Sequence, residues 1–326
     1  MSELRKNPLS NRWVLIAPQR GRRPSSFAGK EERDSSDQCP FCPGNEDLTP
    51  PEIYRFPEES EEWQLRVIPN KYPAIEPAIT NPSTGIGLRE TKAVTGQHEV
   101  IIDHRKHSCK IYAFNSRDFE NLLQVYQSRL RANLSSPGIA SVVLFRNYGH
   151  RAGASLDHPH SQLISLSFVP QWLRRELDTL ADYHHQSGEC LLCQSLETEE
   201  KRRELIVAQN SYFTVLAPFA SLFPCELWIV PRDHNSSLSD LSGRELSCLA
   251  HLLQQTINSL GVLLERPSLN YYFHLAPSGE YFFHWHLEII PRISIPAGFE
   301  YATGVMINTY APQEAAEQLR SIINEG

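Results

Sequence analysis

One arrangement of residues occurs twice along the chain, and this repeat is the strongest constraint on the fold. Each copy has a C-x2-C pair, then a single His, then a helical pattern, a β-rich run and a His-x-His motif. The two sets are Cys39, Cys42, His107, His158, His160 and Cys190, Cys193, His234, His284, His286. The single His precedes the first His of the motif by 51 residues in one copy and by 50 in the other. Such self-similarity indicates a duplicated structural unit.

The segments after the two single histidines have the apolar spacing of amphipathic helices. The apolar positions are Phe119, Leu122, Leu123, Tyr126 and Leu130 in the first copy and Leu246, Leu249, Leu253, Ile257 and Leu260 in the second. Ser242 and Glu245 predict a capping box at the start of the second helix. We therefore predict an α+β fold of two units, at residues 1–165 and 185–326, with a helical connector at about 166–184.

Composition and charge exclude several classes of protein. The net charge of −7 and the absence of long basic runs argue against a nucleic-acid-binding surface. The N-terminus lacks the apolar core of a signal peptide, and no apolar stretch approaches the length that spans a bilayer. We expect a cytoplasmic protein, in which an odd number of cysteines, seven here, argues against a disulfide framework.

The repeated cysteines and histidines predict two zinc sites of the Cys2His2 type. One would use Cys39, Cys42, His107 and His158, and the other would use Cys190, Cys193, His234 and His284. A redox role for the C-x2-C pairs is the alternative, although neither pair has the surroundings of a thioredoxin-like βαβ unit. Cys109, Cys225 and Cys248 are interpreted as small core residues.

The His-x-His motifs predict function as well as structure. Within a strand, side chains two residues apart point to the same face, which suits a metal ligand next to a nucleophile. A pair of buried structural histidines is the alternative, but it does not explain why both copies carry the same accompanying residues.

The segment Gly153-Ala-Ser-Leu-Asp-His158-Pro159-His160-Ser161-Gln162 resembles the active-site signature of the galactose-1-phosphate uridylyltransferase family, duplicated members of the histidine triad superfamily. NPLSNRWVLIAPQRGRRP near the N-terminus and Phe145-Arg146-Asn147-Tyr148-Gly149 are also similar to that family. The resemblance covers nearly the whole chain. It implies histidine-triad-like units, a nucleotidyl-histidine intermediate, a nucleotide sugar donor, an acceptor that is a sugar 1-phosphate or phosphate, and a homodimer.

The resemblance also assigns roles to individual residues. It implies that His160 is the nucleophile and that Gln162 donates a hydrogen bond to the phosphoryl group. The residues that it places at the substrate are Arg20, Arg23, Asn70, Asn147 and Glu300, and Ser161 is of the right type to join them. We expect a backbone carbonyl to hold the other nitrogen of His160, because a neutral imidazole needs one fixed tautomer to act as a nucleophile.

A second metal set is possible by the same resemblance. Some bacterial members bind a metal with a Glu sixteen residues beyond the nucleophile and three histidines, which match Glu176, His274, His284 and His286 here. His284 cannot easily serve this set and the Cys190/Cys193 set together. We favour the Cys2His2 set because it repeats the first copy ligand for ligand.

Departures from the family pattern leave the acceptor open. Lys71 stands where an acidic residue is expected, and Ser294 and Met306 replace a Lys and a Gln that hold the hexose phosphate. Ser161 and the Gly-Phe-Glu-x-x-Thr-Gly run look more like the ADP-glucose phosphorylase branch, which transfers an adenylyl group to phosphate. We expect a UDP-glucose–hexose-1-phosphate uridylyltransferase, with that phosphorylase as the alternative. A nucleotide-binding protein without turnover is the alternative of another class.

Overall fold

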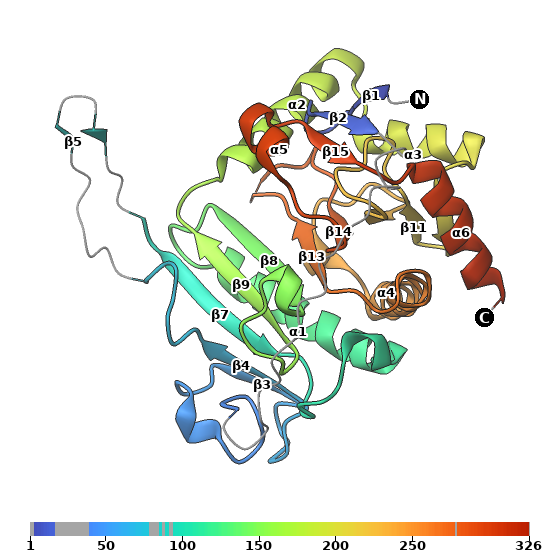
Figure 1. Cartoon of the computed structure of the whole chain (residues 1–326). Coiled ribbons are helices and arrows are strands. Elements are labelled where there is room, and N and C mark those ends of the chain that lie inside the picture. Colours follow the sequence, from blue (N-terminus) through green and yellow to red (C-terminus); the bar gives the residue numbers. More distant parts are fainter. Residues whose placement is uncertain are drawn as a thin grey trace.

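The fold is described from a computed structural model that covers residues 3–16, 39–77, 85–86, 89–90, 94–277 and 279–325. Its centre is a sheet of ten antiparallel strands in the order β10-β11-β12-β14-β13-β8-β9-β7-β4-β3 (Figure 1). The strands are β3 (Tyr54–Phe56), β4 (Leu65–Pro69), β7 (Gly96–Ile102), β8 (Ser141–Tyr148), β9 (His160–Leu166), β10 (Ile206–Gln209), β11 (Phe213–Leu216), β12 (Leu227–Pro231), β13 (Leu269–His274) and β14 (His286–Pro291). This mixed architecture confirms the predicted α+β class.

The sheet has the symmetry that the sequence repeat predicts. From the centre outward, β8-β9-β7-β4-β3 on one side corresponds to β13-β14-β12-β11-β10 on the other. The two sets join where β8 pairs with β13, so that Asn147 lies opposite Asn270. The second His of each His-x-His motif, His160 or His286, begins an equivalent strand, β9 or β14.

The prediction that each whole motif lies inside a strand is wrong by two residues. His158 and His284 precede the strands, and Pro159 separates His158 from His160. A proline cannot donate to the sheet ladder, which explains why regular pairing starts only after it. The Pro159 carbonyl instead accepts a hydrogen bond from the Asp103 N–H at 2.9 Å. His158, which precedes the strand, has its Nδ1 close to the sulfurs of Cys39 and Cys42.

Two long helices, α1 (Ser116–Leu134) and α4 (Gly243–Leu263), pack side by side against one face of the sheet (Figure 1). All ten apolar positions predicted for these helices are buried in the main core. The capping box of Ser242 and Glu245 is present, and α1 has a matching box formed by Asn115 and Asp118. The periodicity therefore identified both helices correctly, and the predicted capping box identified the start of α4.

The remaining elements lie at the ends of the sheet and between its halves. A small sheet joins the two ends of the chain, since β2 pairs with β1 on one side and with β15 on the other. A short hairpin, β5 and β6, projects from the body (Figure 1). The bounds are β1 (Glu3–Lys6), β2 (Trp13–Ile16), β5 (Gly85–Ile86), β6 (Arg89–Glu90), β15 (Met306–Asn308), α2 (Gln171–Ser187), α3 (Leu191–Arg202), α5 (Gly298–Thr303), α6 (Pro312–Glu325), η3 (Glu46–Leu48), η4 (Ile111–Ala113), η5 (His150–Ala152) and η6 (Leu238–Asp240).

The strand register decides which side chains face away from the helices. Gln162 pairs with Val100 and with Phe145, and Tyr272 pairs with Phe145 and with Glu288. Because paired residues share a face, one face carries His160, Gln162 and Asn147 from the first half and His274, His286 and Glu288 from the second. Among the described helices, none is long and apolar enough to cross a membrane.

Candidate active site

His160 has the surroundings of a nucleophile held in one tautomer. It is buried at the start of β9, and its Nδ1 lies 2.8 Å from the carbonyl oxygen of His158. A carbonyl can only accept, so Nδ1 carries the proton and Nε2 keeps its lone pair. Burial lowers the pKa of His160, the carbonyl of His158 raises it, and Arg146 lowers it. The expected backbone partner is therefore present, and the ring is neutral at pH 7.

Gln162 and Asn147 lie on the face that His160 occupies, and each is held through its carbonyl oxygen. Oε1 of Gln162 lies 2.8 Å from Nε2 of His98. Oδ1 of Asn147 accepts a hydrogen bond from Nδ2 of Asn270, in the other half of the molecule, at 2.8 Å. Each contact leaves the NH2 group of the amide to donate elsewhere, as an anionic phosphoryl group requires.

Ser161 does not reach this face, which corrects its predicted contact with substrate. Its side chain is fully buried on the helix side of the sheet, where its hydroxyl donates to Oδ2 of Asp103 at 2.8 Å and bonds the hydroxyl of Tyr126. Neighbouring residues of a strand point to opposite faces, so Ser161 must face away from His160 and Gln162. Ser161 therefore belongs to a hydrogen-bonded group beneath His160.

A buried ion pair completes that group. Nη1 of Arg146 lies 3.1 Å from Oδ2 of Asp103, and both side chains are almost fully buried. Burial raises the pKa of Asp103 to about 6, against the lowering effects of Arg146 and Ser161. Tyr126 of α1 also bonds the hydroxyl of Tyr271 on β13, at 2.7 Å. The group beneath His160 is thus shared by both halves of the chain.

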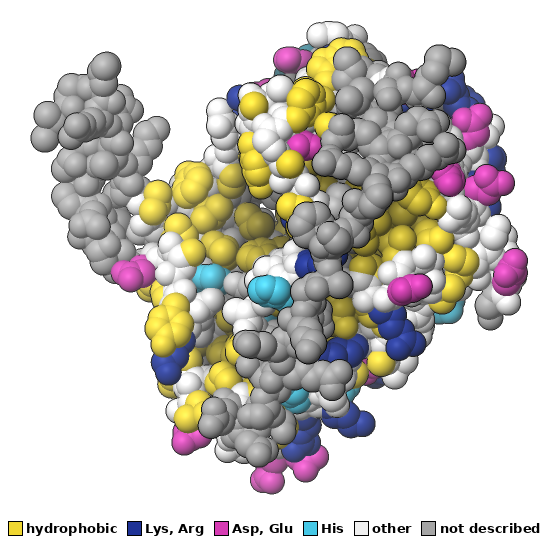
Figure 2. Space-filling model, viewed as in Figure 1, with side chains coloured by type: hydrophobic (Ala, Val, Ile, Leu, Met, Phe, Trp, Pro, Cys, Tyr) yellow, Lys and Arg dark blue, Asp and Glu magenta, His cyan; other side chains and the backbone are white. Residues whose placement is uncertain are grey.

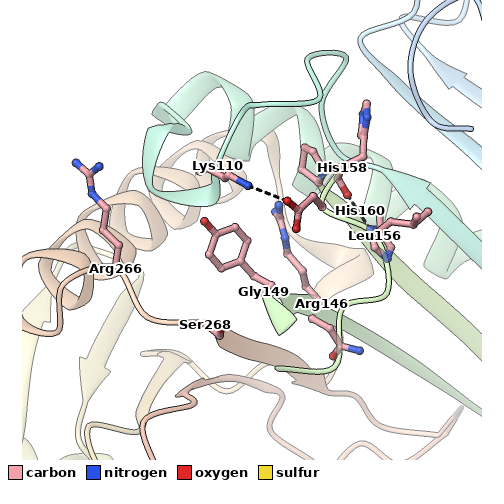
Figure 3. Close-up of a pocket in the computed structure, with 12 residues that line it drawn as sticks. Lys110, Arg146, Gly149, Leu156, His158, His160, Arg266 and Ser268 are labelled. Carbon is pink, nitrogen blue, oxygen red and sulfur yellow. Dashed lines mark hydrogen bonds and ion pairs between the residues drawn. The ribbon is translucent and has the colours of Figure 1, made fainter. Parts of the chain in front are cut away.

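A cavity opens at His160 (Figure 3). His158 and His160 lie at one end of it and Arg266 at the other. Three cationic side chains line the cavity, Lys110, Arg146 and Arg266, and Nζ of Lys110 lies 3.7 Å from a carboxylate oxygen of Asp157. Sequence reasoning did not identify Lys110 or Arg266, because they lie outside the signature motifs. The cavity therefore offers a nucleophile, an amide donor in Asn147 and positive charge at one place.

The turn after β8 needs glycine where the chain passes close to the second half. Gly149 has a φ of 79°, in the left-handed region, and a Cβ there would lie 2.3 Å from Oγ of Ser268. A side chain at this position would both strain the backbone and collide with Ser268. This requirement explains the glycine of the Phe-x-Asn-x-Gly turn.

The first predicted metal site has the spacing that zinc requires. Cys39, Cys42, His107 and His158 come together, and Nδ1 of His158 lies 3.7 and 3.6 Å from the two sulfurs. Tetrahedral zinc, with Zn–S near 2.3 Å and Zn–N near 2.05 Å, places sulfur and nitrogen roughly 3.6 Å apart. Nε2 of His158 donates to the carbonyl of His104 at 2.8 Å, the kind of outer contact that orients a ligand. The donors and their spacing fit zinc.

The second predicted site has the same design. Cys190, Cys193, His234 and His284 come together, and Nδ1 of His284 lies 3.8 and 3.4 Å from the two sulfurs. Nε2 of His234 lies 2.8 Å from the carbonyl of Tyr281. None of the seven cysteines, all of which lie in the described residues, is part of a disulfide. These donors also fit zinc.

The two alternative metal sets do not compete for His284 in the structure. His284 lies with the cysteines, while Glu176, His274 and His286 form a separate group in which His274 is partly exposed. Glu288 joins that group, with Oε1 3.1 Å from Nε2 of His274 and 3.7 Å from Nε2 of His286. Neither of these two nitrogens has a hydrogen bond of acceptable geometry in the described part of the chain. Sequence reasoning missed Glu288, although it lies two residues after His286.

Of the remaining predicted substrate residues, the structure describes Asn70 and Glu300. Asn70 follows β4, and its side chain lies 3.2 Å from Nε2 of His98. Glu300 accepts the N–H of Ala297 at the start of α5 and is not among the residues that line the His160 cavity. Arg20 and Arg23 fall outside the described residues.

Comparison with known proteins shows the family to which the chain belongs. A family model described as galactose-1-phosphate uridyl transferase, N-terminal domain, matches residues 1–170. A model described only as a domain of unknown function matches residues 89–325. ADP-glucose phosphorylase from Arabidopsis thaliana is 35% identical, and the match covers 98% of this chain and 93% of that protein. Galactose-1-phosphate uridylyltransferase from Thermotoga maritima is 28% identical over 98% of each.

Solved structures agree as well. The crystal structure of an Arabidopsis thaliana ADP-glucose phosphorylase with bound ADP-glucose has a TM-score of 0.85 and 33% identity, covering 98% of this chain and 99% of the other. A uridylyltransferase structure has a TM-score of 0.79 and 26% identity, covering 100% and 99%. The chain is therefore a nucleotidyltransferase that belongs to the galactose-1-phosphate uridyl transferase family.

Proposed function

We propose that this enzyme transfers a nucleotidyl group from a nucleotide sugar through a covalent intermediate on His160. The observation that carries the proposal is the hydrogen bond from Nδ1 of His160 to the carbonyl of His158, which leaves Nε2 as the nucleophile. Nε2 attacks the α-phosphorus of the donor, a P–N bond forms, and the bond to the sugar 1-phosphate breaks. An oxygen of the acceptor then attacks the same phosphorus, and the P–N bond breaks to restore the neutral ring.

Amide and cationic groups around His160 would stabilise the transition state. Phosphoryl transfer places charge on the equatorial oxygens, and preorganised donors meet that charge without reorganising. Gln162 and Asn147 would supply amide protons, and Lys110 would supply positive charge from the wall of the cavity. Arg20, Arg23 and Asn70 stay candidate substrate ligands on the strength of the family resemblance.

For the acceptor we propose inorganic phosphate, with an ADP-sugar as the donor, rather than a hexose 1-phosphate. Met306, which replaces a Gln that would bind the sugar, packs against the apolar cluster of Val14 and Ala220. A thioether in such a cluster offers a hexose no useful hydrogen bond. The whole-chain likeness to the Arabidopsis ADP-glucose phosphorylase also supports phosphate. The uridylyltransferase reaction is the second candidate, favoured by Glu176 at the spacing found in bacterial members of that family.

The deciding experiment forms the nucleotidyl-enzyme first and discharges it afterwards. The protein is mixed with ADP-glucose or UDP-glucose labelled at the α-phosphorus, and the labelled adduct is isolated. Phosphate or galactose 1-phosphate is then added. We expect the adduct to form from ADP-glucose and to be discharged by phosphate. Discharge by galactose 1-phosphate alone, after labelling by UDP-glucose, would establish the second candidate instead. Tight binding of both donors without any adduct would mean that the protein only binds nucleotides.

Zinc at both Cys2His2 sites is part of the proposal. Cys39, Cys42, His107 and His158 would hold one ion, and the second set would hold the other. The metal supplies structural support, because it ties each C-x2-C turn to the residues before a central strand. Reduced thiols are required for this, which agrees with the predicted cytoplasmic location.

The group of Glu176, His274, His286 and Glu288 is a candidate for a further divalent cation. The group offers two carboxylates and two imidazoles. These ligands suit harder cations than the thiolates of the Cys2His2 sites do. Metal analysis of the intact protein tests this directly. Loss of one metal equivalent in Glu288→Gln, with both zinc ions retained, would support the site. An unchanged metal content in that variant would exclude it.

A homodimer completes the proposal. Large apolar side chains are exposed, among them Trp172, Ile295, Phe299 and Tyr301. Figure 2 shows that apolar side chains gather on the face of the molecule seen in Figure 1. Exposed apolar side chains that gather on one face mark a site of interaction with another protein. Light scattering that gives the mass of two chains would support the dimer, and the mass of one chain would exclude it.

A further inference from the structure

His98 lies next to Gln162 on the face of the sheet that carries His160. Val100 of β7 pairs with Gln162 of β9, and His98 pairs with Ile164. His98 and Gln162 are therefore diagonal neighbours on one face, a distance that long side chains can bridge. Nε2 of His98 lies 2.8 Å from Oε1 of Gln162. Neither the repeat nor the family signature pointed to His98.

The backbone fixes the tautomer of His98. The N–H of Ala74 donates to Nδ1 of His98 at 3.1 Å, so this nitrogen is an acceptor and carries no proton. A neutral imidazole has one donor and one acceptor, so its proton must be on Nε2. Burial lowers the pKa of His98, against the raising effect of Gln162, which keeps the ring neutral at pH 7. The Nε2–H group then needs an acceptor.

Asn70 does not serve as that acceptor. Its Oδ1 already accepts the N–H of Tyr72 at 2.8 Å, which turns its NH2 group toward Nε2 of His98 at 3.2 Å. Two donors cannot form a hydrogen bond with each other. The proton of His98 therefore goes to the oxygen of Gln162, and the Asn70 NH2 group is left for another acceptor.

We propose that His98 is a positioning residue that fixes the orientation of the Gln162 side-chain amide. With Oε1 held by His98, the NH2 group of Gln162 is the part that can donate to a phosphoryl oxygen at His160. An amide rotated by half a turn would instead present its oxygen to an anionic group and repel it. His98 thereby keeps the donor in place before the substrate arrives, which is the condition for efficient stabilisation of the transition state. This inference rests on the proposed role of Gln162.

The test is a set of variants measured in a single turnover. His98→Leu removes the donor, and His98→Gln keeps an N–H group close to the position of Nε2. The rate of adduct formation from labelled ADP-glucose is measured for each, and the Kd for ADP-glucose is measured in a His160→Ala background. We expect His98→Leu to slow adduct formation by about 10- to 100-fold with little change in Kd, and His98→Gln to recover most of the rate.

A double variant separates positioning from general damage. If His98 acts only through Gln162, His98→Leu should cost nothing further in a Gln162→Ala background. His251→Leu, which removes an exposed histidine of α4, is the matched control and should keep the wild-type rate and melting temperature. An additive loss in the double variant, or a wild-type rate in His98→Leu, would overturn the inference while leaving the proposed function intact. A wild-type rate in Gln162→Ala would instead remove the premise about Gln162.

Discussion

The imidazole of His160 donates its Nδ1 proton to the carbonyl oxygen of His158, 2.8 Å away. His158 in turn points its own Nδ1 at the sulfurs of Cys39 and Cys42. His158 therefore contributes its side chain to the candidate metal site and its backbone carbonyl to the proposed nucleophile. A metal at this site would hold the nucleophile in place without touching the substrate.

Replacing His160 should separate binding from chemistry. We expect His160→Ala to bind the nucleotide sugar within a few fold of the wild-type Kd and to form no labelled adduct, because only the covalent step is lost. His286→Ala changes the equivalent residue of the second half and should retain activity within about tenfold. Adduct formation by electrophoresis of the labelled protein is the measurement. Equal losses in both variants would show that the two halves are not divided in function.

The two zinc sites should differ in their effect on catalysis. We expect about two zinc ions per chain in the Cys2His2 sites, and one fewer in Cys190→Ser and in Cys39→Ser, with loss of stability in both. Only Cys39→Ser should also slow adduct formation in the protein that stays folded, since only that site contains His158. Zinc content by mass spectrometry and single-turnover labelling are measured on the same samples. Unchanged zinc in Cys190→Ser would exclude the second site.

The buried pair of Asp103 and Arg146 should be costly to break from one side. Asp103→Asn would leave the guanidinium of Arg146 buried without its counter-charge, and we expect a loss of about 3–5 kcal/mol in the free energy of unfolding. The double variant Asp103→Asn with Arg146→Met removes both charges and should lose less. Urea unfolding of all three proteins decides the matter. A double variant that is less stable than Asp103→Asn alone would contradict this account.

Asn270 should matter to the proposed substrate contact of Asn147, in the other half of the chain. Its Nδ2 donates to Oδ1 of Asn147 and to the carbonyl of Ala152, at 2.8 and 2.9 Å. Asn270→Asp keeps the size but replaces the donor with an acceptor, which should turn the Asn147 amide and slow adduct formation by about tenfold or more. Asn210→Asp, in the loop between β10 and β11, is a control for the same chemical change away from the site. A wild-type rate in Asn270→Asp would exclude this coupling.

Local patterns in the sequence were sufficient for much of the fold. Helical periodicity identified α1 and α4, and the capping residues Ser242 and Glu245 identified the start of α4, because a helix is specified by residues within a few positions of one another. The repeated spacing of cysteines and histidines predicted the duplication. It also predicted the members of the two Cys2His2 groups that the structure contains. The motif around His160 identified the candidate nucleophile and the adjacent Gln162. In each case the informative residues are close in sequence or recur at matching intervals.

Only the tertiary structure decided which distant side chains meet. The strand register turns Ser161 toward Tyr126 and Asp103, and it brings His98 to Gln162 and Asn270 to Asn147. The same packing assigns His284 to the cysteines and leaves Glu288 with His274 and His286. A shift of one residue in a strand pairing would move each of these side chains to the opposite face of the sheet. Nothing within a single strand specifies that register. The sequence by itself therefore determined the parts of the site, and the pairing of strands from both halves determined how each side chain is oriented.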